Sequence, residues 1–310
     1  MSSANFSNRQ NRLRQNRPIL EARAKIIGAI RHYFEAQDFL EVETPIRIKA
    51  PAPELNIDTE PSGDHFLIAS PELQMKQLVA AGYGKIFQIT KCFRRGERGD
   101  RHLPEFTMLE WYETGGTMAT LMDRCQGIIA AGAKAVAKWP LFSFGDLPVS
   151  LDGSWHCMEV QDAFETFAGW RPGANPNPFK FDMDLVDRVE PALPTDKPLF
   201  LCGYPASMAS LARLDPASDA RALRLELYAG GLELANGFEE LTDPVAQRQR
   251  FEAEEAERRE AGKPPYPLDE AFLSALSSGM PPCAGMAMGL DRLIMLFTDS
   301  KKISDVAPLS

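Results

Sequence analysis

The sequence contains no apolar run near the roughly 20 residues that a membrane-spanning helix requires. Its first residues lack the apolar segment of a secretory signal, so we expect neither a membrane protein nor a secreted one. Cysteines are few as well: five in 310 residues, scattered and never in a C-x-x-C pair. That spacing argues against a disulfide framework and a zinc site, and it predicts a protein of the reducing cytoplasm.

An excess of positive charge is also missing. The chain has 34 Lys and Arg against 43 Asp and Glu, a formal net charge of −9, and a pI near 5.1, so non-specific nucleic-acid binding is disfavoured. The exception is the segment 1–17, which has no acidic residue and four arginines, Arg9, Arg12, Arg14 and Arg17. We predict a flexible basic tail over 1–17 and one domain over 18–310. An arm for an acidic partner and a transit peptide are the alternatives.

The most informative stretch is 86–113, which is typical of a strand, a charged loop over 95–105 and a second strand over 106–112. Alternation places a polar set on one face of each strand: Gln88, Thr90, Cys92 and Arg94 on the first, and Phe106, Met108, Glu110 and Tyr112 on the second. Antiparallel pairing would gather an arginine, an aromatic ring and a carboxylate over one surface. The cationic loop could then fold over an anion; a solvated surface hairpin is the alternative.

A second hairpin is predicted over 223–241, with its turn at Gly230–Gly231. Glu233 and Glu240 are seven positions apart, so a regular strand would point them to opposite faces. A bulge, which we place at Asn236–Gly237, would bring both to one face. Two carboxylates that face a polyphosphate require a divalent cation, most simply Mg²⁺. Two exposed glutamates are the alternative.

Helix signals divide the rest of the chain. Ser70 and Pro71 open a helix with Glu72 in its first turn, and Asp291–Arg292 open another after a strand of small residues. Arg292 would place a cation near the positive N-terminal end of the second helix, an unfavourable position that indicates a ligand anion there. The alternative is a surface arginine. The other predicted helices cover 19–37, 117–138, 158–170, 182–190, 243–261 and 269–277, and the other strands cover 39–45, 66–70 and 198–204.

Three of these segments resemble the motifs of class II aminoacyl-tRNA synthetases. FRRGERGDRHLPEFTMLEWY resembles motif 2 of the lysyl type, CAGMAMGLDRLIMLF resembles motif 3, and the early helix, strand and Pro45 have the layout of motif 1. The resemblance spans roughly 20–306 in the expected order. It implies an α+β fold with an antiparallel sheet flanked by helices, a homodimer formed through motif 1, and the binding of ATP and Mg²⁺.

The same resemblance implies roles for single residues. Arg94 and Arg292 would be catalytic. The ATP site would comprise Arg94, Arg95, Gly96, Glu97, His102, Leu103, Phe106, Glu233, Leu234, Gly289 and Arg292. The amino-acid site would comprise Ser70, Pro71, Glu72, Glu110, Tyr112, Glu240 and Ala287, and the metal ligands would be Glu233 and Glu240. Gly96 and Leu103 depart from the usual motif 2, which has an acidic residue and an asparagine there, and would weaken ATP binding.

The resemblance to lysyl-tRNA synthetases begins near residue 20 and includes no anticodon-binding domain, so we expect no stable tRNA binding. The chain is therefore similar to the stand-alone paralogues that modify elongation factor P. This similarity implies activation of (R)-β-lysine by ATP and transfer to a lysine ε-amino group of the factor. The Ala287 methyl, where synthetases usually have glycine, would favour the β-amino acid by about 1–3 kcal/mol. The alternatives are α-lysine as substrate, a tRNA or small-molecule acceptor, and a non-catalytic regulatory subunit.

Overall fold

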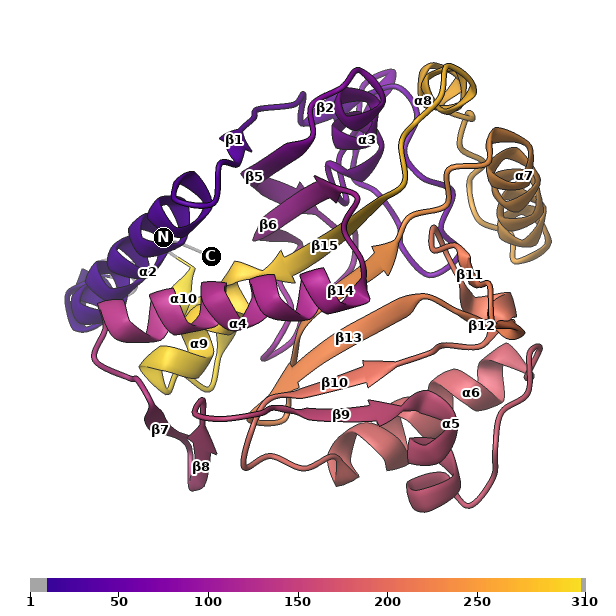
Figure 1. Cartoon of the computed structure of the whole chain (residues 1–310). Helices are drawn as coiled ribbons and strands as arrows, with labels where there is room; N and C mark the ends of the chain where they lie inside the picture. The colour runs from indigo at the N-terminus through magenta and orange to yellow at the C-terminus, as the bar shows by residue number, and fades with distance from the viewer. Residues whose placement is uncertain (1–9, 308–310) are drawn as a thin grey trace.

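The computed structural model describes residues 10–307 and is built around an eight-stranded sheet (Figure 1). The strand order is β1-β5-β6-β15-β14-β13-β10-β9. The six inner strands are antiparallel, while β1 and β9 at the edges run parallel to their neighbours. The strands are β1 Leu40–Glu41, β5 Lys85–Phe93, β6 Glu105–Thr114, β9 His156–Glu159, β10 Leu199–Cys202, β13 Arg224–Ala229, β14 Leu232–Glu239 and β15 Cys283–Gly289. The predicted α+β class is confirmed.

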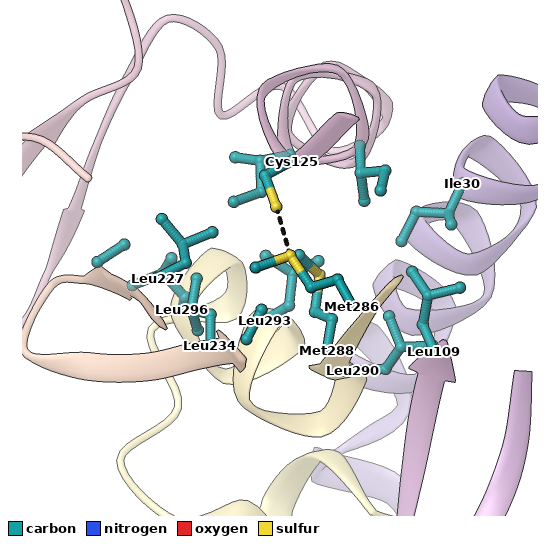
Figure 2. Packing of buried hydrophobic residues seen from close by; sticks show 14 of the residues in the cluster. Ile30, Leu109, Cys125, Leu227, Leu234, Met286, Met288, Leu290, Leu293 and Leu296 are labelled. Atoms are coloured by element: carbon teal, nitrogen blue, oxygen red, sulfur yellow. Dashed lines mark hydrogen bonds between the residues drawn. The ribbon is translucent and has the colours of Figure 1, made fainter. Parts of the chain in front are cut away.

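One face of this sheet is apolar and lies beneath three helices, α2 (Arg17–Glu35), α4 (Met118–Ala135) and α9 (Leu290–Thr298). Figure 2 shows Leu109 of β6 and Met286 of β15 packed toward Cys125 of α4 and Ile30 of α2. These side chains are buried because alternate residues of the inner strands are apolar. Their alternation leaves the polar residues of the same strands on the opposite face.

The opposite face is covered only at its two ends. Helices α3 (Glu72–Ala80), α7 (Pro244–Glu260) and α8 (Glu270–Ser277) lie at the β5–β6 end. The segment from α5 through η3 packs on β10 and β13 at the other end, and its elements are α5 Val160–Ala163, η1 Phe164–Ala168, α6 Pro178–Asp184, η2 Leu185–Val189 and η3 Glu190–Ala192. Both groups of helices leave the middle of the sheet open, above its polar side chains.

Short elements complete the chain. They are β2 Arg47–Ile48, β3 Pro61–Ser62 and β4 His65–Leu67 in one small sheet, the hairpins β7 Leu141–Phe144 with β8 Leu147–Ser150 and β11 Leu214–Asp215 with β12 Ser218–Ala222, η4 Ala206–Met208, and α10 Ile303–Val306. No helix within residues 10–307 has the length and apolarity to cross a bilayer.

Capping residues place several helix ends where the sequence predicts them. Thr117 accepts from the Thr120 main-chain N at the start of α4, and Asp243 accepts from Val245 N and Ala246 N at the start of α7. One predicted boundary is wrong: the helix expected over 182–190 begins earlier, at Pro178. Asn177 caps it and proline occupies its first turn, so the start signal was present but hidden among prolines and asparagines.

Only part of the predicted flexible tail over 1–17 lies within the described residues. Residues 10–15 are helical, and residues 1–9 lie outside the described part of the chain. Arg12 donates through Nη2 to the Ser304 main-chain O at 2.8 Å, and Asn16 Nδ2 donates to the Asp305 O at 3.3 Å. These contacts to α10 fix residues 10–17 on the surface, which the sequence alone could not reveal because the partner lies near the other end of the chain.

Candidate active site

A cavity of about 1030 Å³ lies over the open middle of the sheet and is lined by β6, β13, β14 and β15. It brings together all of the predicted site residues except two. Arg95 is exposed outside the lining and contacts the Asp58 carbonyl only through its main-chain N, at 2.7 Å. Pro71 also lies outside it, where it precedes α3. The assignment of these two residues to the ligand site stays a prediction, and the structure places them outside the cavity lining.

Arg94 and Phe106 form one end of the cavity. The Arg94 guanidinium carbon lies 5.2 Å from the centre of the Phe106 ring, a cation–π distance. Arg94 also approaches Glu97 at 3.8 Å, a weak ion pair. Its Nε is buried and has no partner. A buried guanidinium N–H without an acceptor is costly, so this end of the cavity fits an anion such as a phosphate.

Arg292 lies across the cavity at the start of α9. Its Nη1 donates to the Glu233 main-chain O at 2.9 Å and contacts Glu233 Oε2 at 3.0 Å. Its Nη2 lies 2.7 Å from His102 Nε2. Burial and the Arg292 charge lower the pKa of His102, so the imidazole is neutral and its Nε2 accepts the hydrogen bond. Arg292 is therefore oriented by two segments far apart in the sequence.

The adjacent Asp291 is a structural residue. Its carboxylate is buried and accepts from Arg23 Nη1 at 2.5 Å and from the Thr107 main-chain N at 2.7 Å. This residue ties α9 to α2 and to β6 in one contact. It thereby sets the position of Arg292 relative to the strand that bears Phe106.

A bulge in β14 brings the strand's carboxylates to the cavity face. Leu227 pairs with Ala235, and Tyr228 pairs with Glu233, so Leu234 is the extra residue. The expectation that a bulge is required is confirmed, but its position at Asn236–Gly237 is wrong. Beyond the bulge, Glu233 faces the same side of the sheet as Glu226 of β13.

Glu226 is the nearest carboxylate partner of Glu233. Burial, followed by the charge of Glu226, raises the pKa of Glu233, while Arg292 opposes the rise. Glu226 itself accepts from Arg224 Nη2 at 2.7 Å and from the Tyr228 hydroxyl at 2.7 Å. A cation between Glu226 and Glu233 would relieve their repulsion.

The predicted metal ligands Glu233 and Glu240 lie near opposite ends of β14, and their pairing stays a prediction. The six residue steps that remain after the bulge separate the two Cα atoms by about 20 Å along the strand. Glu240 instead forms an ion pair with Lys76 at 2.5 Å, deep in another part of the cavity. Within residues 10–307, no group of three or more His, Cys, Asp or Glu is arranged to hold a metal.

That deep part, the amine pocket, consists of Ser70, Glu72, Lys76, Glu110, Tyr112 and Glu240. Glu110 accepts from the Ser70 hydroxyl at 2.7 Å and from the Tyr112 hydroxyl at 2.5 Å. Lys76 donates to Glu72 at 2.5 Å. Three carboxyl groups thus face one ammonium, and with all three ionised the pocket has a formal surplus of two negative charges. Burial raises the pKa values of Glu110 and Glu240 to about 8, and a bound cation would favour their ionised forms. Such a pocket suits a ligand with two ammonium groups.

Glycine at position 285 makes the amine pocket compact. A Cβ built on Gly285 would lie 2.2 Å from the Tyr112 ring and 2.6 Å from Glu240 Oε1. The motif 3 glycine therefore makes room for the pocket's own side chains. The next residue on the same face, Ala287, pairs with Glu110 across the strands and packs on Cys92 and Met108. Its methyl group lies in the cavity lining beside Glu110.

Sequence reasoning missed Lys76, Glu226 and Arg224. Lys76 follows Glu72 by four positions on α3, a spacing that indicates an ion pair on one helix face. Glu226 lies on the strand before the Gly230–Gly231 turn, so a correctly registered hairpin would have indicated it. Arg224 has no comparable signal. Its guanidinium stacks 4.2 Å from the Tyr204 ring centre, a contact that only the folded chain creates.

Glu110 gives the amine pocket a pH dependence. Burial, followed by the charge of Glu72, raises the pKa of Glu110 to about 8. The folded state therefore holds this proton more tightly than the unfolded state, and the stability that it contributes is lost as pH rises through about 8. Because glutamine mimics the neutral acid, we expect Glu110→Gln to melt like the parent protein near pH 5 and several degrees higher near pH 9.

Thermal melts without ligand would test this expectation. Glu105→Gln is the matched control, since Glu105 lies on the same strand but is exposed, and it should leave the melting temperature unchanged at both values. If Glu110→Gln shifts the melting temperature equally at both pH values, Glu110 ionises as an ordinary carboxyl group.

The mixed sheet, its arginine-lined end and its carboxylate pocket together define a class II synthetase catalytic core. The chain belongs to this family, since the family model for class II tRNA synthetases (D, K and N) matches residues 4–310. The chain is also similar to proteins named elongation factor P–(R)-β-lysine ligase. That of Haemophilus influenzae strain Rd is 37% identical over 315 residues, with 92% of each chain covered. Those of Proteus mirabilis and Vibrio parahaemolyticus are both 38% identical, with 92–94% of each chain covered.

Proposed function

We propose that the protein activates (R)-β-lysine with ATP and transfers the β-lysyl group to a lysine ε-amino group of elongation factor P. The observation that carries this proposal is the amine pocket, whose surplus of two negative charges matches the two ammonium groups of a diamino acid. The arginines of the phosphate end line the same cavity. The names of the relatives indicate (R)-β-lysine as the amino acid and elongation factor P as the acceptor.

The chemistry follows from the two ends of the cavity. A carboxylate oxygen of β-lysine forms a bond to the α-phosphorus of ATP, the bond to the bridging oxygen breaks, and pyrophosphate leaves. The amino group of the acceptor lysine then forms an amide with the acyl carbon, and AMP leaves. We assign Arg94 to the charge on the α-phosphate and Phe106 to stacking on adenine. The amine pocket orients the substrate carboxylate toward Arg94.

For Mg²⁺, we propose Glu226 and Glu233 as the protein ligands. The two carboxylates face one side of the hairpin, and burial followed by the charge of Glu226 raises the pKa of Glu233, which supports a cation between them. Mg²⁺ is commonly held by one or two carboxylates together with phosphate oxygens and water. It would supply neutralisation of phosphate charge there.

We also propose a homodimer, a cytoplasmic location and no stable binding of tRNA. The dimer is supported by exposed apolar side chains after α2, Leu40 and Ile46. The location is supported by the five free thiols. The weak tRNA binding is supported by the net charge of −9.

Pyrophosphate release from ATP tests the function, with (R)-β-lysine, α-lysine or no amino acid, each with and without elongation factor P. We expect faster release with (R)-β-lysine and a mass gain of one β-lysyl group on the factor. Release with α-lysine and no mass gain would redirect the assignment to tRNA or a small acceptor. No release with any substrate would contradict catalysis and favour a regulatory subunit.

A further inference from the structure

The helical stretch from α6 into η2 exposes a row of large apolar side chains. Phe179, Met183 and Val186 are 73%, 48% and 57% exposed. Their spacing of four and three residues places them on one side of the helix, and we refer to these three residues as the apolar stripe. Large apolar side chains gathered on a surface mark an interaction site more often than isolated ones do.

The other sides of α6 are already occupied. Phe181 is buried and stacks on Phe164 with ring centres 4.4 Å apart, which anchors the helix on the sheet. Pro178 and Asp182, four positions apart, line the active-site cavity. The helix therefore has one side in the core, one side in the cavity wall, and the apolar stripe next to the cavity side. The stripe therefore lies beside the residues of α6 that line the cavity.

A second wall of the same cavity is acidic. Glu254 and Glu257 of α7 line it together with Glu54. Glu257 is exposed, while Glu254 and Glu54 are half-buried. Electrostatic coupling of Glu54 and of Glu254 to Glu72 places this wall next to the amine pocket. A cationic side chain that enters from the surface would thus meet the carboxylates of this wall before those of the amine pocket. Figure 1 shows α6 and α7 on either side of the β11–β12 hairpin.

We propose that the apolar stripe is the docking surface for the protein acceptor, whose lysine enters past the acidic wall. This inference rests on the proposed function, which requires a lysine of a folded protein to reach the cavity. A lysine has only a four-carbon stem, so the main chain around it must come to the mouth of the cavity. Because α6 supplies Pro178 and Asp182 to the cavity lining, an acceptor whose lysine enters beside α6 would meet the apolar stripe with the surface next to that lysine. An apolar patch next to the reactive lysine of the acceptor is the complementary feature.

The test separates activation from transfer. Activation is measured with hydroxylamine, which traps the activated acyl group as a hydroxamate without any protein acceptor. Transfer is measured as the mass gain of elongation factor P at varied concentrations of the factor. For Phe179→Ser, Met183→Ser and Val186→Ser combined, we expect hydroxamate formation within about twofold of the parent, and a KM for the factor raised at least about tenfold.

Leu141→Ser is the matched control, because Leu141 is 60% exposed on the β7–β8 hairpin, away from the cavity lining. It should change neither the rate of hydroxamate formation nor the KM for the factor. Phe179→Asp alone repeats the test at the most exposed position, in case the triple variant loses hydroxamate formation by misfolding. An unchanged KM for the factor in Phe179→Asp would overturn the proposal. The proposal would also be overturned if light scattering gave the Phe179→Asp variant a molar mass different from that of the parent protein. That result would assign the apolar stripe to a contact with a second copy of the chain. If the parent protein does not modify the factor, the proposed function itself fails.

Discussion

Arg94→Ala is expected to reduce pyrophosphate release with ATP and (R)-β-lysine by at least about 1000-fold, with little effect on stability. The guanidinium lies beside Phe106 in the cavity lining, and its buried Nε has no partner within residues 10–307. The fold therefore does not depend on that donor. Negative charge that develops on a phosphate during the reaction would depend on it for stabilisation. Removal of a preorganised donor costs most in a site that excludes water.

The control for this variant is Arg171→Ala. Arg171 is an exposed arginine that pairs with Asp162 and Glu165, and it is absent from the cavity lining. It should retain parental activity. Circular dichroism melts of both variants would establish that each remains folded. Persistent pyrophosphate release from folded Arg94→Ala would show that the assignment of this arginine is wrong.

Glu240→Gln is expected to raise the KM for (R)-β-lysine by about 100-fold, which corresponds to about 2.7 kcal/mol. Glu240 is fully buried beside Lys76, so the substitution lowers the surplus that the amine pocket has with every carboxyl group ionised from two negative charges to one. One ammonium of the substrate then lacks its counter-charge at a buried position. The Mg²⁺ concentration for half-maximal rate should remain that of the parent protein.

Glu226→Gln provides the reciprocal comparison. It keeps one of the two oxygens, which accept separately from Arg224 and from Tyr228, and it removes one of the two charges beside Glu233. We expect a higher Mg²⁺ requirement at an unchanged KM for (R)-β-lysine. The opposite result, a Mg²⁺ shift in Glu240→Gln and none in Glu226→Gln, would restore Glu240 as the metal ligand.

The class of fold could be predicted from the sequence because its signals are local. Residues Gln88 to Arg94 and Phe106 to Tyr112 alternate as strands, and the structure pairs them as β5 and β6. The turn at Gly230–Gly231 is likewise where β13 and β14 meet. Alternation and turn chemistry depend on neighbours in sequence, so tertiary context seldom alters them. The helix start at Pro178 shows the limit, since its signal was diluted by surrounding loop-forming residues.

The sequence by itself determined the order of the elements, the hairpin that bears Arg94 and Glu110, and the carboxylate character of the site. Only the tertiary structure decided which carboxylates work together. One extra residue, Leu234, turns Glu233 toward Glu226, because a shift of one residue moves every side chain of a strand to the other face. The approach of α3 to the sheet then joins Lys76 to Glu240, across a sequence distance that no periodicity describes.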